Sequence, residues 1–206
     1  MASLAGIKVI SIDYRLAPEH EFPAATEDVV AVYRDLLNHY PATCIGIYGC
    51  SAGGLLTAQA VACLQKVGLP LPGAIGMLFG AGSFWTEGDT GAFRPLFAGA
   101  PLEGSREHPY FRNTDPNDPL AFPLRSADVL GRFPPSLLVS ATRDHALSSV
   151  VQTHSSLIRL GVEARLHVWE GLGHAFFFEP DLPQSREVYE IATRFFAGHL
   201  ASSTRK

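Results

Sequence analysis

Short apolar blocks alternate with longer amphipathic blocks along this chain, and each kind of block predicts one kind of secondary structure. The short blocks are rich in Val, Ile and Leu and are bounded by Gly, Pro or polar residues, as is typical of buried strands. They predict strands at residues 7–12, 44–48, 74–79, 136–141 and 164–169.

The amphipathic blocks predict helices between these strands. Pro23 opens the first, with Glu27 and Asp28 in early turns, where the helix dipole favours acidic residues. The other blocks predict helices at about residues 52–66, from about residue 146 to a stop at Gly161, and around residues 188–196. Residues 81–134 have many Gly and Pro and predict an irregular segment with one or two short helices.

The alternation predicts an α/β fold with a mostly parallel, doubly wound sheet covered by helices on both faces. About five strands are recognisable. No linker, internal repeat or low-complexity segment divides the sequence. We therefore expect a single domain over residues 1–206.

Composition excludes several classes of function. The 206 residues carry a net charge of −4 without a run of basic residues, which argues against a nucleic-acid partner. The uncharged stretch 67–86 contains five Gly and two Pro, so it does not predict a membrane span. The N-terminus lacks the pattern of a signal peptide. Three cysteines are too few for a disulfide framework, and we expect a cytoplasmic location.

The first motif with a candidate catalytic residue is Tyr48-Gly-Cys-Ser-Ala-Gly-Gly54, which lies between a predicted strand and a predicted helix. Gly-x-Ser-x-Gly in that place is typical of a nucleophilic serine on a sharp turn, an arrangement that we call the elbow. Gly49 and Gly53 are expected to leave room for that turn, where side chains would clash. Ser51 is therefore the candidate nucleophile.

Two further candidates follow later strands. Asp144 comes after the strand at 136–141, and His174 lies in a Gly-rich loop after the strand at 164–169. Open parallel sheets carry their sites beyond the carboxyl ends of the strands, so the three side chains are expected to meet there. The chain order Ser, Asp, His is that of α/β-hydrolases. His174 would take the serine proton, and Asp144 would orient the imidazole.

Structural roles are the alternative for each candidate. Ser51 and Asp144 are also suitable helix caps, and a lone histidine such as His174 is often a packing residue. Cys50 is not favoured as the nucleophile because the elbow exposes its neighbour. His145 is interpreted as loop and His167 as part of a strand. No group of residues has metal-ligand spacing or the pattern of a phosphate or dinucleotide cradle, so neither a metal nor a cofactor is expected.

These motifs resemble those of the bacterial hormone-sensitive-lipase family of esterases, within the α/β-hydrolase fold. The resemblance rests on five segments: VISIDYRLAPEHEFPAATED (9–28), GCSAGG (49–54), NDPLAFPL (117–124), TRDHALSS (142–149) and GLGHAFF (171–177). The residues after Asp144 depart from the commoner Asp-Pro/Glu-Leu form. The resemblance implies hydrolysis of small, short-acyl carboxylic esters through an acyl-enzyme, without a cofactor.

The sequence also departs from the family upstream. The family's His-Gly-Gly-Gly loop, which supplies most of the oxyanion hole, is not found here, nor are its N-terminal cap and first three strands. The N–H of Ala52 is then the one evident oxyanion donor. We therefore expect either a weak esterase or, as the alternative, a truncated and catalytically crippled or dead fragment. A ligand-binding receptor, as in the plant gibberellin receptors, is disfavoured because His174 is present.

The resemblance has a structural consequence as well. The family's third strand lies between the strands that match 7–12 and 44–48, so its absence leaves a gap. Either these two strands pair directly, or both keep unpaired edges that invite a homodimer or other self-association. The sequence does not identify the acyl and alcohol groups of the substrate. Phe79, Phe84, Trp85 and Phe176 could line an apolar pocket, although we favour a core role for them.

Overall fold

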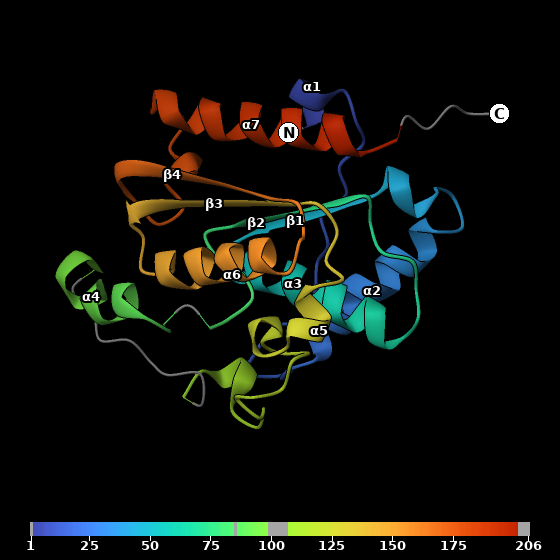
Figure 1. The fold of residues 1–206 in the computed structure, drawn as a ribbon, viewed down its shortest axis with the longest axis horizontal. Helices are drawn as coiled ribbons and strands as arrows, with labels where there is room; N and C mark the ends of the chain where they lie inside the picture. Colours follow the sequence, from blue (N-terminus) through green and yellow to red (C-terminus); the bar gives the residue numbers. More distant parts are fainter. Residues whose placement is uncertain (1, 85, 99–106, 202–206) are drawn as a thin grey trace.

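A four-stranded parallel sheet organises the computed structural model, which describes residues 2–84, 86–98 and 107–201. Its order is the order of the sequence: β1 (Gly46–Cys50), β2 (Ala74–Leu78), β3 (Ser136–Arg143) and β4 (Ala164–Gly173). The arrows of β3 and β4 point to the left in Figure 1, so the carboxyl ends of these strands lie at that side of the molecule. The sequence predicts all four strands, with boundaries displaced by a few residues.

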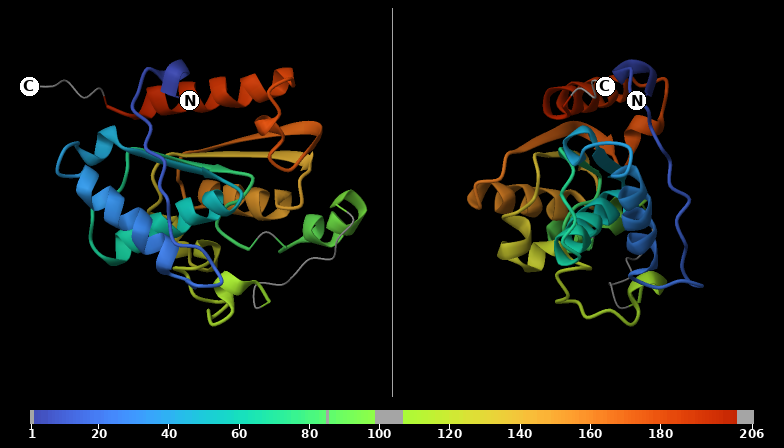
Figure 2. Two further views of the ribbon diagram at one scale, coloured as in Figure 1. Left: turned by 180° about the vertical axis from the view of Figure 1, so that it is seen from behind. Right: turned by 90° about the vertical axis from the view of Figure 1, so that its right-hand side faces the viewer.

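Helices cover both faces of the sheet (Figures 1 and 2). One face carries α7 (Pro183–His199), which contacts the short α1 (Ala2–Ala5). The other carries α2 (Ala24–Leu36), α3 (Ala52–Lys66) and α6 (Leu147–Arg159). Four 3-10 turns complete the connections: η1 (Ala42–Cys44), η2 (Pro109–Phe111), η3 (Pro123–Arg125) and η4 (Phe176–Phe178). This confirms the doubly wound α/β architecture.

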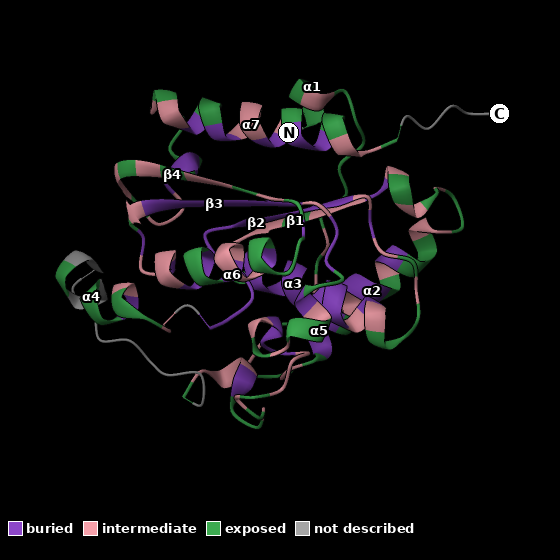
Figure 3. Ribbon diagram, viewed as in Figure 1, coloured by how far each residue is buried: buried purple, intermediate pink, exposed green. Residues whose placement is uncertain are grey.

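The central strands are buried on both sides, as Figure 3 shows for most of β3. Successive side chains of a strand point to opposite faces, so β3 serves two cores. Leu137 and Val139 pack with Phe195 and other residues on the α7 side, whereas Leu138 packs with Val150 and its neighbours on the α6 side. The continuous apolar run of β3 therefore reflects burial on both faces, which fixes the site-bearing carboxyl end of the strand.

Residues 7–12 do not form the predicted strand. They belong to an extended segment that leaves α1 and runs outside the sheet toward α2 (Figure 2), and Ile7, Val9 and Ile10 are exposed. Among the described residues, β1 hydrogen-bonds to β2 alone, so four strands form where about five were expected. The prediction failed because β-propensity reports packing on a sheet surface, and this segment has no strand beside it.

Residues 81–134 were expected to form an irregular segment with one or two short helices. Their described parts include α4 (Asp89–Ala98) and α5 (Ala127–Leu130) besides η2 and η3. Trp85 and residues 99–106 lie outside the described residues, so the expectation for Trp85 is not addressed. Phe79, Phe84 and Phe176 are all buried members of the core, as favoured above.

The helices of the structure do not include a candidate membrane span among the described residues. Within the described ranges, none of the helices is both long and apolar enough to cross a bilayer.

Candidate active site

Ser51 lies in a strained turn between β1 and α3. Its backbone has φ 58° and ψ −119°, a conformation that L-residues rarely adopt. The residue occupies the N-cap position of α3, yet its side chain makes no capping hydrogen bond there. The side chain is thus directed elsewhere, which sets aside the helix cap as its sole role.

Close backbone contacts hold this elbow. A Cβ at Gly49 would lie 2.2 Å from the Gly53 carbonyl oxygen, and a Cβ at Gly80 would lie 2.2 Å from the Ser51 carbonyl oxygen. Gly54 is similarly restricted by the Gly80 carbonyl oxygen at 2.5 Å. A Cβ at Gly53 itself meets nothing within 4 Å, so the expected clash there is wrong. The backbone of residue 53 approaches Gly49, so the restriction falls on residue 49 and not on residue 53. The sequence motif did not reveal Gly54 and Gly80.

We predict that Gly49→Ala destabilises the fold by more than about 3 kcal/mol, the upper end for overpacking, because backbone atoms cannot move aside as a flexible side chain can. The matched control is Gly53→Ala, which should change the free energy of unfolding by no more than about 1 kcal/mol. Urea denaturation of both variants measures the difference. Equal stabilities would contradict this account of the elbow.

The structure brings the three candidate side chains into one hydrogen-bonded row. The His174 ring places Nε2 at 2.8 Å from Ser51 Oγ and Nδ1 at 2.6 Å from Asp144 Oδ1. These contacts join the ends of three strands, β1, β3 and β4, although the residues are far apart in the sequence. With the proton on Nδ1, His174 donates to Asp144 and can accept the serine proton at Nε2.

Asp144 is buried, and both of its carboxylate oxygens have hydrogen-bond partners. Its Oδ2 accepts from Ser140 Oγ at 2.7 Å, and its Oδ1 accepts from the Ala146 N–H at 2.9 Å as well as facing His174. The capping role considered for Asp144 is not observed, because Ala146 is the N-cap of α6 and no side chain caps this helix; the bond from the Ala146 N–H is a local turn contact. A buried carboxylate with these donors is held in one position.

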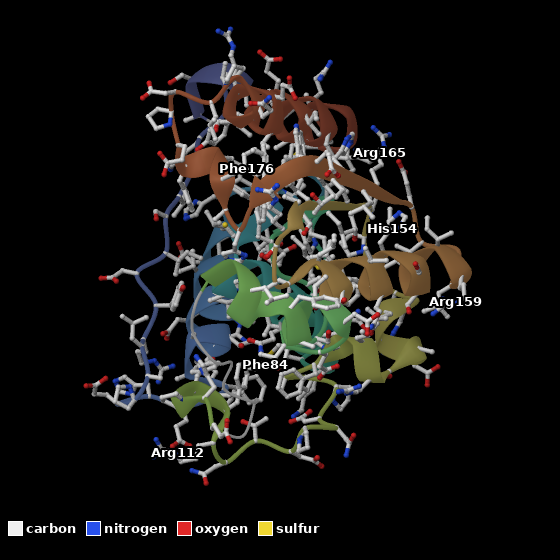
Figure 4. All side chains as sticks on the ribbon, turned by 90° about the vertical axis from the view of Figure 1, so that its left-hand side faces the viewer. Phe84, Arg112, His154, Arg159, Arg165 and Phe176 are labelled. Carbon is white, nitrogen blue, oxygen red and sulfur yellow. The ribbon has the colours of Figure 1, made fainter. Side chains whose placement is uncertain are left out.

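His174 is held by its surroundings as well. The ring of Phe79 meets it edge-on at 5.7 Å between centroids. The Gly171 N–H donates to Thr142 Oγ1 at 2.8 Å, which ties the carboxyl-terminal parts of β3 and β4 together. Figure 4 views this carboxyl-end side of the molecule, with Phe176 toward α7 and Phe84 on the opposite side. Phe79 thus has a role at the site in addition to its core role.

His145 also lies at the site, although the sequence interpretation placed it in a loop without function. Its ring centroid is 4.3 Å from that of His174, and its Nδ1 is 3.8 Å from Asp144 Oδ1. Within the part of the chain that the structure describes, Asp144, His145 and His174 form the one group of three side chains that could hold a metal ion. Sequence spacing could not reveal it, because the fold brings His174 to the other two.

Cys50 adjoins the nucleophile but is chemically unsuited to replace it. Burial raises the pKa of its thiol to about 12, with a further contribution from the charge of Asp144. We predict that iodoacetamide at pH 8 labels Cys50 at least about 100-fold more slowly in the native protein than in urea. Peptide mass spectrometry distinguishes it from Cys44 and Cys63, and native labelling at the rate of a free thiol would refute the burial argument.

The raised pKa also links Cys50 to stability. The folded state binds this proton more tightly than the unfolded state, so the stabilisation is complete below the unfolded pKa of about 8.5. It is lost as the pH rises toward the folded value of about 12. We expect the free energy of unfolding to fall above about pH 9, and the fall to be smaller in Cys50→Ala.

Comparisons with known proteins show which family this chain resembles. A family model described as "alpha/beta hydrolase fold" matches residues 1–178. An acetyl-hydrolase of Streptomyces hygroscopicus is 31% identical over 95% of this chain and 66% of its own length. An acetyl esterase of Salmonella paratyphi B is 26% identical over 97% of this chain and 65% of its own length. The chain thus spans just under two thirds of these relatives.

Solved structures show the same likeness. The crystal structure of an esterase from the bacterial hormone-sensitive lipase family superposes with a TM-score of 0.88 at 32% identity, covering 97% of this chain and 68% of that one.

Proposed function

The chain belongs to the bacterial hormone-sensitive-lipase family of α/β-hydrolases, and from that membership we propose that it is a serine hydrolase of small, short-acyl carboxylic esters. The observation that carries the proposal is the unbroken row Asp144–His174–Ser51, with contacts of 2.6 and 2.8 Å. A serine hydroxyl becomes a competent nucleophile when a base lies in this position and a third group orients that base.

In the proposed acylation, Ser51 Oγ attacks the ester carbonyl carbon while its proton passes to His174 Nε2. Asp144 stabilises the imidazolium that results. The carbonyl oxygen becomes an oxyanion, and the Ala52 N–H, in the first turn of α3, is the donor that we assign to it. The first N–H groups of a helix have no intrahelical partner, so this one is suited to an anion. Collapse of the intermediate returns the proton from His174 to the alcohol that leaves.

Deacylation repeats these steps with water. His174 Nε2 takes a proton from a water molecule, which attacks the acyl carbon of the Ser51 ester, and then returns the proton to Ser51 Oγ. The carboxylic acid leaves, and the enzyme is restored. The proposed cycle uses the three side chains, the Ala52 N–H and water.

The oxyanion site sets the expected rate. One donor contributes roughly 10²–10³ in kcat, and among the described residues Ala52 is the donor that we can assign. Kinetic measurements decide between an active esterase and the alternative, a catalytically crippled or dead form.

The short-acyl assignment draws support from the names of relatives, which include an acetyl-hydrolase and an acetyl esterase. Its test is a series of p-nitrophenyl esters from acetate to decanoate. We expect kcat/KM to be highest for acetate or butyrate and to fall with longer acyl groups. A preference for decanoate would contradict the assignment.

We further propose that the protein self-associates in a cytoplasmic setting. The free edge of β1 among the described residues supports pairing with a second copy, and the three free cysteines support a reducing compartment. Light scattering coupled to size-exclusion chromatography should report a dimer or larger species. A monomer at all concentrations would contradict the self-association.

A further inference from the structure

The residue after the acid departs from the family pattern, and in the fold its side chain stands over the proposed base. We propose that Asp144, His145 and His174 form an inhibitory binding site for Zn²⁺. The metal-binding claim stands on the geometry of the three side chains, whereas the inhibitory consequence rests on the proposed function.

The three side chains offer the donors that zinc prefers. Their ligand atoms, one carboxylate oxygen and two imidazole nitrogens, all lie within 4.8 Å of one another. His nitrogen and Asp oxygen are both common zinc ligands, and three protein ligands with a water in the fourth position is a typical open site. The donor set is therefore complete without a residue from elsewhere.

The required rearrangement involves both imidazole rings, whose centroids are 4.3 Å apart with 36° between the planes, and which must turn so that both Nδ1 lone pairs point at one ion. Tetrahedral zinc at its usual bond lengths separates neighbouring donor atoms by about 3.3 Å. The present Nδ1–Oδ1 distances are 2.6 Å for His174 and 3.8 Å for His145, so the first ring must withdraw slightly and the second must approach. Asp144 Oδ2 keeps its bond from Ser140 Oγ in this arrangement.

Access and backbone anchoring also favour the site. The side chains of His145 and His174 are 18% and 24% exposed, so a hydrated ion can reach the nitrogens from solvent. The His145 carbonyl accepts from Thr90 Oγ1 at 3.1 Å, and Ser148, near the start of α6, bonds to the same residue of α4. The loop that presents His145 is thereby fixed beside the imidazole of His174.

Zinc at this place would stop the proposed reaction through the tautomer of His174. In the hydrolytic state the proton is on Nδ1, and the Nε2 lone pair faces Ser51 Oγ. When Nδ1 gives its lone pair to zinc, the neutral ring carries its proton on Nε2 instead. The ring loses no net proton, but Nε2 can no longer accept the serine proton, so nucleophilic attack is blocked.

Binding is tested first without catalysis. The Ser51→Ala variant keeps all three ligands and lacks the nucleophile, and its Zn²⁺ affinity can be measured by competition with a chromophoric zinc chelator. We expect one Zn²⁺ per chain. Loss of an outer-shell partner of a metal ligand already costs about 10–100-fold in affinity, so His145→Gln or His145→Asn in this background should weaken binding at least tenfold.

The control is His39→Gln, at an exposed position away from the site. It should leave the affinity unchanged, and a cooperative thermal melt shows which of the two His145 variants is folded. No stoichiometric Zn²⁺ binding to Ser51→Ala, or equal affinity in a folded His145 variant, would overturn the site and would leave a packing role for that ring.

Inhibition is tested second, in the enzyme with Ser51 intact. ZnCl₂ should inhibit hydrolysis of p-nitrophenyl acetate, and a chelator should reverse the inhibition. The inhibition constant should rise at least about tenfold in His145→Gln, each variant being compared with its own metal-free rate. Zinc binding without inhibition would overturn the tautomer argument, whereas a protein without esterase activity that binds Zn²⁺ through His145 would overturn the proposed function alone.

Discussion

Ser51→Ala should lower kcat/KM for p-nitrophenyl acetate by at least about 10³-fold, to the level of a protein that merely binds the ester near an oxyanion donor. The methyl group cannot form the acyl-enzyme, and His174 Nε2 loses the hydroxyl that now lies 2.8 Å away. Steady-state hydrolysis at neutral pH measures the loss.

The neighbouring Cys50→Ala is the matched control. This side chain makes no hydrogen bond to His174 in the structure, and its raised pKa keeps it a neutral thiol. We expect the control to retain most of the activity. Equal rates for wild type and Ser51→Ala would mean that any hydrolysis arises elsewhere, and the proposed function would fall.

Asp144→Asn should also be strongly damaging, with a loss of about 10⁴-fold in kcat. The amide would present N–H groups to His174 Nδ1 and so favour the tautomer that carries its proton on Nε2, the wrong form for a base. The variant also disturbs a buried group that accepts from Ser140 Oγ and the Ala146 N–H. Some stability should be lost as well.

Two measurements separate these effects. Urea denaturation gives the loss of stability, and kinetics below the transition gives the loss of kcat in the folded variant. Asp128→Asn, at an exposed position on α5, is the control and should match wild type in both. A folded Asp144→Asn protein with nearly full activity would show that the carboxylate does not orient the base.

Sequence reasoning located the site better than it described the backbone around it. Ser51, Asp144 and His174 could be found because each follows a predicted strand, and parallel strands bring their carboxyl ends together. The strand expected at 7–12 failed because pairing is a property of the assembled sheet and not of a segment.

The sequence was a poorer guide to the close contacts around the site. The motif marked Gly49 and Gly53 as places without room; the structure confirms the restriction at Gly49, shows none at Gly53, and adds Gly54 and Gly80. The sequence showed that the residues after Asp144 depart from the family form, but it did not place His145 at the site, because that depends on a ring 29 positions away in the chain (174 − 145) that folding brings to 4.3 Å. Site residues that follow a sequence motif can therefore be predicted from the sequence. Those that depend on contacts made only in the folded chain cannot.

The central claim is that Ser51 is an activated nucleophile, and active-site titration with a p-nitrophenyl phosphonate tests it most directly. This reagent phosphonylates an activated serine and releases one p-nitrophenol per modified site, regardless of how slow the turnover of ester substrates is. We predict a stoichiometric burst, with the mass increase on the peptide that contains Ser51 and no burst from Ser51→Ala. The absence of a burst from the folded wild-type protein, or a label on another residue, would contradict the account.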